Sequence, residues 1–265
     1  MDEVLSEKPW STGRILSQTQ RERKRIMNRV SQSKRRDRLK KSVKSMENRL
    51  DDDTTMRDFL SGALRSVFSY NPLQVCTNDQ FNQDALIRGV IYGWGVLQKE
   101  YFTCPIWSIL SRIDILLTKN AAIETRLAVL RGIHLILLSW TFPDHPPPVA
   151  PWFRPRKFQV SSPDNLIFDY FAWPHFRERL IASNYPKLTN RFWFYFSRNM
   201  RFEWPFPPNH TIDIDKDSGK YHFTMTWRAA TDSIQRFTMG PEFFQAYPDC
   251  YEDIQASYSL YDIVI

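Results

Sequence analysis

A long stretch that lacks both prolines and aromatic residues marks the N-terminal part of this 265-residue chain. No proline occurs between Pro9 and Pro72, and no aromatic residue occurs between Trp10 and Phe59. Proline interrupts helices, and aromatic side chains supply much of the contact area of a packed core. The stretch therefore predicts an extended, solvent-exposed helix over residues 17–70, after a disordered N-terminus at residues 1–16.

The positive charge of the chain is concentrated within this predicted helix. Residues 21–44 contain twelve Lys or Arg and two acidic residues, which makes +10. Because the formal net charge of the whole chain is +7, the remaining residues together carry −3. A local block of this kind is typical of a surface that binds phosphate groups or a charged membrane.

Five residues of the basic segment fall on one helical face that suits the edges of DNA bases. Positions 28, 31, 32, 35 and 36 have the spacing of one face, and amide and guanidinium groups there pair with adenine and guanine respectively. These residues are Asn28, Ser31, Gln32, Arg35 and Arg36. Basic residues on the flanks suit the phosphates on either side of a major groove. They are Arg23, Lys24, Arg25, Arg29, Lys34, Arg38, Lys40 and Lys41.

Asn28 is followed by seven residues and then by Arg36. This spacing resembles the basic-region signature of bZIP transcription factors. Residues 28–32 are similar to the fungal AP-1-like subtype, in which a glutamine follows the asparagine by four positions. The resemblance implies a nuclear regulator of transcription that reads double-stranded DNA with the five residues of this face, Arg36 also lying near a phosphate. That subtype usually has alanine in place of Ser31 and phenylalanine in place of Arg35, so its half-site preference is not carried over.

A bZIP basic helix works as a dimer held by a coiled coil that begins about one turn beyond the DNA. Continuing the heptad register from Arg36 places apolar residues at six of eight core positions. The predicted dimerisation residues are Val43, Met46, Leu50, Leu60, Leu64 and Val67. Asp53 and Arg57 occupy the other two positions and destabilise a symmetric pair. We therefore expect a short, weak zipper in a homodimer or in a heterodimer with another bZIP protein.

Two other interpretations of the N-terminal segment stay open. The chain is alternatively a regulator with impaired dimerisation that acts through protein contacts of its C-terminal domain. A basic amphipathic helix for a membrane surface or a calmodulin-like partner is a further alternative, although residues 21–41 offer few apolar side chains for one. A charged face that is simply solvated is the plainest interpretation.

Residues 80–265 predict a mostly helical globular domain. Apolar residues at helical spacing indicate helices over residues 86–101, 106–117 and 123–137, and further helices follow at 174–183 and 187–200. A proline-rich loop occupies residues 143–163, and residues 210–214 and 221–227 predict a β-hairpin around the turn at 215–219. Gly240 and Pro241 open a last short helix. The predicted fold class is mainly α: a long N-terminal basic helix with a short, weak coiled coil, then a helical domain with a small β-hairpin.

Three aromatic stretches of this domain carry a second resemblance. They are Phe171–Leu180, Phe202–Pro205 and Glu242–Pro248. They resemble the C-terminal domain of undefined function that follows the basic region in many filamentous-fungal bZIP proteins. The resemblance extends from about Phe81 and is strongest after Pro151, and it implies no catalytic residues.

Two features of this domain are compatible with a ligand site but favour packing. Arg177 and Arg179 lie beside aromatic residues, where arginine either binds an anion or stacks and pairs within the protein. The run Phe192–Phe196 either lines a small-molecule cavity or fills the core. We expect packing in both cases.

Other chemistry is not supported by the sequence. Asp213, Asp215 and Asp217 begin like a calcium loop, but Ser218 and Thr224 stand where glycine and glutamate are needed, which predicts a plain turn. The histidines and three cysteines lack metal-ligand spacing, and no phosphate-binding glycine loop occurs. We expect no enzyme activity, cofactor, metal or membrane segment, and reduced thiols in an intracellular protein.

Overall fold

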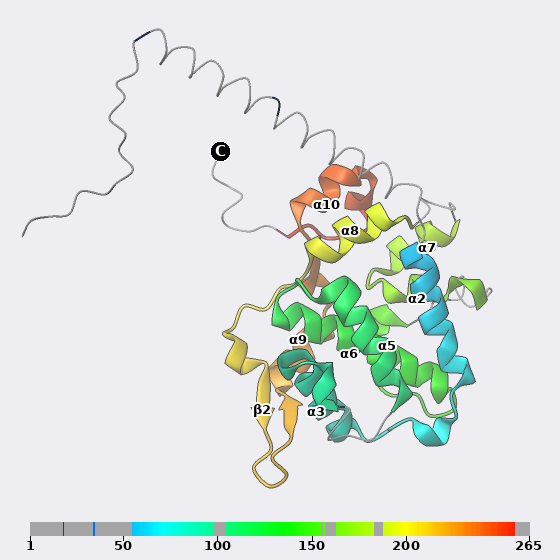
Figure 1. Cartoon of the computed structure of the whole chain (residues 1–265), viewed down its shortest axis with the longest axis vertical. Coiled ribbons are helices and arrows are strands. Elements are labelled where there is room, and N and C mark those ends of the chain that lie inside the picture. The colour runs from blue at the N-terminus through cyan, green and yellow to red at the C-terminus, as the bar shows by residue number, and fades with distance from the viewer. Residues whose placement is uncertain are drawn as a thin grey trace, which may run out of the picture. The chain divides into compact units, whose positions relative to one another are not determined.

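Helices make up most of the chain that the structure, a computed structural model, describes (Figure 1). The described residues are 55–97, 104–154, 156, 163–182 and 188–257, together with positions 18 and 34. The chain divides into a unit at Met1–Arg49 and a compact unit at Leu50–Ile265. Of the first unit only Gln18 and Lys34 are described, and both are helical and exposed.

The described residues of the compact unit form α-helices, short 3-10 helices, one π-helical turn and four short strands. The α-helices are α2 (Thr55–Arg65), α3 (Asp79–Tyr92), α5 (Pro105–Ile113), α6 (Ile123–Thr141), α7 (Pro174–Ala182), α8 (Asn190–Asn199), α9 (Met225–Thr231) and α10 (Pro241–Ala246). The strands are β1 (Met200–Phe202), β2 (Ile212–Ile214), β3 (Tyr221–Phe223) and β4 (Phe237–Met239). The π-helical turn η4 is Asp114–Thr118. The 3-10 helices are η1 (Ser66–Ser69), η2 (Pro72–Gln74), η3 (Trp94–Val96), η5 (Pro151–Phe153), η6 (Pro163–Tyr170), η7 (Pro208–His210), η8 (Ile234–Arg236) and η9 (Pro248–Glu252).

Local signals at helix ends explain where the structure departs from the predicted ranges. Helix α3 ends at Tyr92, not near residue 101, because Gly93 takes a left-handed backbone with φ of 91°. The predicted strand at 221–227 ends at Phe223, because the Thr224 hydroxyl accepts a hydrogen bond from the Trp227 amide and caps α9. The predicted short helix after Gly240 is confirmed as α10.

Helix α6 lies at the centre of the compact unit, where it packs against α3 and α5 (Figure 1). Leu127, Leu130 and Leu137 of this helix are fully buried. Burying each such side chain contributes about 1.5–3 kcal/mol relative to leaving it in water. The predicted helix at 123–137 is therefore confirmed, and it forms the middle of the core.

A cluster of aromatic rings joins α7, α8 and α10 to the same core. Phe171 packs edge-on against Phe176 and Phe196, with ring centroids 5.2 and 5.1 Å apart. Phe243 of α10 meets Phe196 edge-on at 6.1 Å. Edge-to-face contacts of this kind add about 0.5–1.5 kcal/mol per pair beyond area burial. This cluster supplies the apolar contact that holds the C-terminal helices together.

The two halves of the compact unit share hydrogen bonds as well as a core. The Asp84 and Gln83 side chains of α3 accept hydrogen bonds from the amides of Tyr221 and Phe223, at 2.8 and 2.9 Å. These amides belong to β3, so side chains of α3 cover the backbone donors on one edge of this short strand. Thr125 of α6 likewise accepts from the Phe202 amide of β1 at 3.0 Å. Residues before and after the proline-rich loop therefore form one folded body.

Among the described residues there are two sheets, each of two antiparallel strands. β2 pairs with β3, Ile212 opposite Phe223, which confirms the predicted hairpin. Asp215 closes its turn, because one carboxylate oxygen accepts from the amides of Asp217 and Ser218, and Gly219 has φ of 66°. These bonds lower the pKa of Asp215. β1 pairs with β4, a sheet that the sequence patterns did not predict.

Asp114, at the start of the π-helical turn η4, is the centre of a buried polar network. Its carboxylate accepts hydrogen bonds from the Trp94 indole at 2.8 Å, from Thr118 at 2.7 Å and from Arg126 at 2.6 and 2.9 Å. Burial opposes ionisation of Asp114, but these partners outweigh it and lower its pKa. The network therefore joins η3, η4 and α6 through one charged group.

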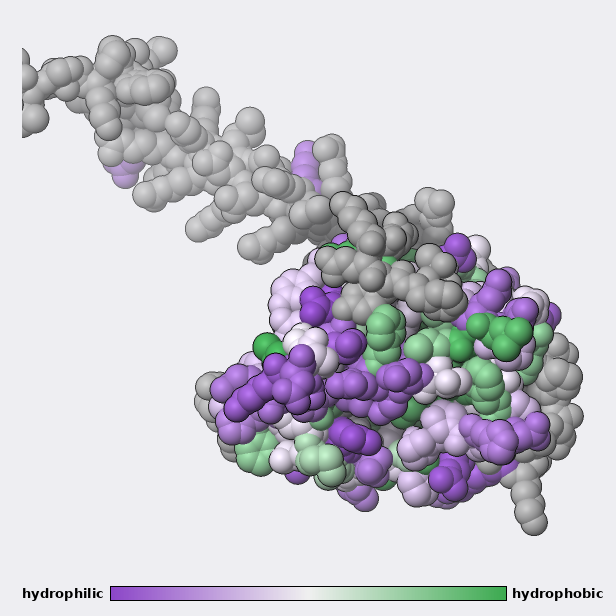
Figure 2. All heavy atoms as spheres, turned by 90° about the horizontal axis from the view of Figure 1, so that it is seen from below, coloured by the Kyte–Doolittle hydropathy of each residue, from purple (hydrophilic) through white to green (hydrophobic). Residues whose placement is uncertain are grey.

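The surface of the described residues is mixed in character. On the face shown in Figure 2, hydrophilic side chains are interspersed with small groups of hydrophobic ones. Large exposed apolar side chains such as Phe68, Leu73 and Met225 lie on different elements, η1, η2 and α9. None of the described helices has the length and apolarity required to span a membrane.

Candidate functional site

The residues predicted to read DNA bases lie outside the described residues. This holds for Asn28, Ser31, Gln32, Arg35 and Arg36. Among the residues predicted to contact phosphates, Lys34 is described, and its side chain is exposed on a helix. An exposed helical lysine is compatible with a phosphate contact. The structure therefore leaves the basic segment as a prediction from sequence.

The predicted zipper residues divide into two groups. Val43, Met46 and Leu50 lie outside the described residues. Leu60, Leu64 and Val67 are described and are at most 2 % exposed. They belong to the core of their own chain, on α2 and the following η1, and not to a face that is open to a second chain. This placement differs from the predicted intermolecular zipper, because an apolar stripe at helical spacing has found an intramolecular partner.

Asn190 at the start of α8 holds the beginning of α2 in this position. Its side-chain oxygen, Oδ1, accepts a hydrogen bond from the Met56 backbone amide at 3.0 Å, and its side-chain nitrogen, Nδ2, donates to the Thr55 hydroxyl at 2.9 Å. The first amides of a helix have no partner within the helix, so a side chain that accepts from one of them stabilises the helix start. The sequence alone did not indicate this contact, because 134 positions separate Met56 from Asn190.

Arg177 is fully buried and binds the protein itself. Its guanidinium donates to the carbonyl oxygens of Phe153, Phe171, Trp152 and Arg154 at 2.9 to 3.4 Å. Burial lowers the pKa of Arg177 to about 10, so it stays charged at neutral pH. The packing interpretation of this residue is confirmed: it joins the loop at 152–154 to the segment before α7.

Arg179 and the aromatic run of α8 also have structural partners. Arg179 forms an ion pair with Asp253 and donates to the Asp249 carbonyl oxygen at 2.8 Å. In the run 192–196, Phe192, Trp193 and Phe196 are buried in the core cluster. The packing interpretation is therefore confirmed for Arg179, which is paired within the protein, and for the three buried residues of the run, whereas Phe194 is 45 % exposed.

A cleft of about 450 Å³ opens at a place that the sequence patterns did not indicate. It lies between α6, the proline-rich segment after it, the start of α3 and the β3–α9 region. Its lining residues are Thr77, Asp79, Gln83, Arg131, Leu135, Leu138, Phe142, His145, Pro147, Pro148, Phe223, Trp227, Arg228, Thr231 and Asp232. A volume of this size is within the range of sites for small organic molecules, roughly 300–1,000 Å³.

Arg131 is held in place at the polar end of this cleft. Its side chain is 11 % exposed, and it forms an ion pair with Asp79. Its second guanidinium nitrogen lies 3.2 Å from Nδ1 of the buried His134. Burial opposes ionisation of Asp79, but the charge of Arg131 and, to a smaller extent, that of Arg228 lower its pKa. Arg131 and Arg228 line the cleft together with Asp79 and Asp232.

His134, next to this cleft, is neutral. Complete burial, with a contribution from the charge of Arg131, lowers its pKa well below 6.5. Because arginine can only donate, Nδ1 of His134 is the acceptor from Arg131 and the proton is on Nε2. The imidazole also stacks on Trp107, with ring centroids 4.8 Å apart. His134 is therefore a packed residue that positions Arg131.

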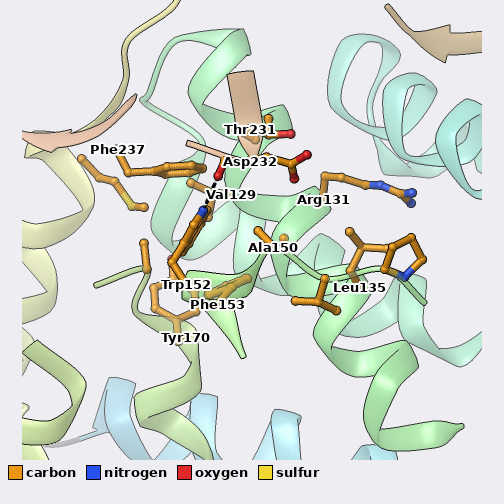
Figure 3. Close-up of a pocket in the computed structure, with 16 residues that line it drawn as sticks. Val129, Arg131, Leu135, Ala150, Trp152, Phe153, Tyr170, Thr231, Asp232 and Phe237 are labelled. Carbon is orange, nitrogen blue, oxygen red and sulfur yellow. Dashed lines mark hydrogen bonds between the residues drawn. The ribbon is translucent and has the colours of Figure 1, made fainter. Parts of the chain in front are cut away.

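A smaller apolar cavity of about 50 Å³ adjoins the cleft and shares part of its lining, including Arg131, Leu135 and Asp232 (Figure 3). Figure 3 shows Trp152, Phe153 and Phe237 on the side away from the guanidinium of Arg131. The Trp152 indole donates to the Asp232 carbonyl oxygen at 2.9 Å, which ties the proline-rich segment to the end of α9. The apolar lining of the cleft thus continues into the smaller cavity.

Among the described residues, no three His, Cys, Asp or Glu side chains lie close enough together to hold a metal ion. Cys76, Cys104 and Cys250 are free thiols.

Comparison with known protein families matches residues 145–258 to a family described as a domain of unknown function, DUF3425. This domain is known from fungal bZIP transcription factors. The match covers the region in which the predicted resemblance is strongest, and it begins well after residue 81; the basic segment lies outside it. No match is found among curated proteins or among solved structures.

Proposed function

We propose that this protein is a sequence-specific regulator of transcription that binds double-stranded DNA in the nucleus as a dimer. The domain at residues 145–258 supports this function, since it is known from fungal bZIP transcription factors. The observation that carries the proposal is the occurrence, in the same chain, of a +10 basic segment with bZIP-like spacing ahead of that domain. The proposed function requires no catalytic residue, cofactor or metal.

In this proposal the basic segment folds into the major groove as it binds. Asn28 and Gln32 pair with adenine edges, and Arg35 and Arg36 pair with guanine edges. The flanking Lys and Arg side chains contact phosphates, which positions the helix and makes the affinity fall as salt rises.

The test is an anisotropy titration of full-length protein against an AP-1-like palindromic duplex and a scrambled duplex at two salt concentrations. The wild-type protein is expected to prefer the palindrome by more than about 100-fold. Asn28→Ala is expected to lose about 1–3 kcal/mol of that preference, because it removes one bidentate base contact. Its salt dependence stays as in the wild type, since the phosphate contacts remain.

A phosphate-contact variant provides the matched control. Lys24→Gln is expected to weaken binding to both duplexes equally and to reduce the salt slope by about 1. If the wild type and Asn28→Ala bind both duplexes alike, base readout is disproved and the segment acts only by attraction to phosphates.

The burial of Leu60, Leu64 and Val67 favours a second candidate function, a regulator with impaired dimerisation that acts through protein contacts. With these side chains in its own core, the chain offers a second chain only the predicted zipper positions before α2. Fewer than two heptads make a weak coiled coil.

Stoichiometry separates the two candidates. Sedimentation velocity of full-length protein with the palindromic duplex is expected to give two chains per duplex for a dimeric bZIP protein. One chain per duplex, unchanged in a Val43→Glu and Met46→Glu double variant, would favour the second candidate. Loss of the two-chain complex in the double variant would favour the first.

A further inference from the structure

Helix α8 carries, on the side away from the core, arginine side chains that lie over aromatic rings. The Arg198 guanidinium carbon is 4.9 Å from the ring centroid of Phe194, and that of Arg191 is 5.8 Å from the ring centroid of Tyr195. The two rings meet edge-on with centroids 5.4 Å apart. A guanidinium that stacks on a ring is already held in orientation, so it loses less freedom when it binds an anion. Arg201, exposed on β1, follows three positions after Arg198, and their Cα atoms are at most about 11 Å apart.

The charge around α8 differs in sign from that of the compact unit. Residues 50–265 contain 21 Lys or Arg and 23 Asp or Glu, which makes −2, whereas residues 179–202 contain five Lys or Arg and no acidic residue. Helices α10 and α2, which pack against α8, together add no net charge, since α10 has one acidic residue and α2 has two arginines and one aspartate. The next acidic residue, Glu203, accepts hydrogen bonds from the hydroxyl groups of a threonine and a serine. Within the part of the chain that the structure describes, neither Arg198 nor Arg201 forms an ion pair, so both charges are open to an anionic partner.

The start of α8 lies at the point where α2 begins (Figure 1). Asn190, the first residue of α8, donates to the Thr55 hydroxyl at 2.9 Å. Only residues 45–54 separate Lys44, the last residue of the basic segment, from Thr55, and a chain of this length spans at most about 40 Å. Helix α8 has ten residues and is therefore about 15 Å long. A duplex that is held by the basic segment is thus tethered within about 55 Å of the end of α8, which gives it a high effective concentration there.

We propose that Arg198 and Arg201 bind phosphates of the DNA that flanks the site read by the basic segment. The inference rests on the proposed function, since the basic segment is what brings the duplex to α8. Charge complementarity and the short tether both favour double-stranded DNA as the partner. Arginine binds a phosphate with parallel hydrogen bonds, and such contacts position a protein on a duplex without reading its sequence. The compact unit therefore adds affinity and a longer footprint, but no sequence preference.

The test measures anisotropy of full-length protein on a short and a long duplex over a series of salt concentrations. The short duplex holds little more than the palindrome, and the long duplex adds about 16 base pairs on each side, which cover about 55 Å. The double variant Arg198→Gln, Arg201→Gln is compared with the wild type on each duplex. On the long duplex it is expected to bind about tenfold or more weakly, and its salt slope is expected to fall by about 2 for each bound chain, since each phosphate contact contributes about 0.9. On the short duplex the two proteins are expected to bind alike.

Two further double variants serve as controls. Arg112→Gln, Arg228→Gln removes the same charge from exposed positions on α5 and α9, and it is expected to keep the wild-type affinity and salt slope on both duplexes. Arg198→Lys, Arg201→Lys keeps the charge at the proposed contacts, so its salt slope on the long duplex is expected to stay as in the wild type. All substituted side chains are exposed, so thermal unfolding of the variants is expected to match that of the wild type.

Three results would overturn the proposal. They are a wild-type salt slope of the Arg198→Gln, Arg201→Gln variant on the long duplex, an equal loss in the control on α5 and α9, and binding of polyglutamate as tight as that of a long scrambled duplex, which would assign these arginines to an acidic protein partner. The proposed function is judged separately, by the preference of the wild type for the short palindrome over a short scrambled duplex. A failure at α8 is therefore distinguishable from a failure of the basic segment.

Discussion

Buried charged side chains join segments of the compact unit that neither a helix nor a sheet connects. Arg177 holds the carbonyl oxygens of the loop at 152–154, and Asp114 joins η3, η4 and α6. The terminal nitrogens of Arg177 and both carboxylate oxygens of Asp114 make hydrogen bonds. Charges that are buried in this way are costly to leave unpaired, so the removal of one partner has a larger effect than the net contribution of the pair.

Substituting Arg177→Met is expected to lower the free energy of unfolding by about 3–5 kcal/mol. The variant leaves several buried carbonyl oxygens without donors and leaves Asp169 without its neighbouring positive charge. Urea denaturation measures the loss. Arg201→Met, an exposed substitution, is the control and stays within about 0.5 kcal/mol of the wild type. Equal stabilities of the two variants would contradict the structural role of Arg177.

The Asp169 carboxyl makes stability dependent on pH. Burial, partly offset by the charge of Arg177, raises its pKa from 3.8 to about 6. A raised folded-state pKa means that the folded protein binds the proton more tightly, so the free energy of unfolding falls as pH rises from about 4 to 6. Asp169→Asn removes this dependence. The free energy of unfolding of Asp169→Asn, relative to that of the wild type, should therefore rise by up to about 3 kcal/mol between pH 4 and pH 7.

Denaturation of the wild type and Asp169→Asn at both pH values measures this gain. The comparison between the two proteins cancels the titration of other groups. If the difference between them is the same at pH 4 and pH 7, the pKa of Asp169 is not raised.

At the scale of elements, α2 is the segment with two competing uses. Its apolar residues continue the heptad register of the basic segment, and the same residues are buried in the core, with Asn190 holding the helix start. An apolar stripe of this kind packs equally well into a coiled coil or against its own domain. The structure assigns it to the domain.

Leu60→Ala is expected to lower the free energy of unfolding by about 2–5 kcal/mol, the cost of a cavity at a fully buried leucine. The effect should not vary with protein concentration, because the contact lies within one chain. Leu73→Ala, at a leucine that is 90 % exposed, is the matched control and should change stability by less than about 0.5 kcal/mol. A loss that grows as the protein is diluted would indicate that Leu60 packs against a second chain.

For the whole molecule, the boundary of the matched domain is not the boundary of the folded unit. Residues 145–258 share their core with α2, α3, α5 and α6, and the backbone amides of β1 and β3 donate to side chains of α6 and α3. The cleft likewise takes its lining from both sides of residue 145. A unit that buries its apolar surface across this boundary cannot keep that burial when it is cut there.

A fragment of residues 145–258 is therefore expected to lack cooperative unfolding, whereas a fragment of residues 50–258 is expected to unfold in a single cooperative transition. Circular dichroism during thermal denaturation, with limited proteolysis at 25 °C, measures both. A 145–258 fragment that melts cooperatively and resists proteolysis would show that the matched region folds by itself.

Local patterns predicted much of the secondary structure. Helix α6 follows from apolar spacing, the start of α7 from Pro174 and the hairpin turn from Asp215 and Gly219, because periodicity, capping and backbone preference act over a few residues. The predicted end of α3 and the predicted end of the strand at 221–227 were wrong. The signals that decide them, Gly93 and the Thr224 cap, are also local.

The sequence by itself determined the concentration of positive charge in residues 21–44, the helical character of the domain and the turn at residues 215–219. Each depends on residue types and their spacing along one segment. The tertiary structure alone decided the partner of Leu60, the pairing of β1 with β4 and the existence of the cleft. These depend on contacts between residues far apart in the chain, and an apolar side chain at helical spacing carries no information about which of several apolar surfaces it will meet.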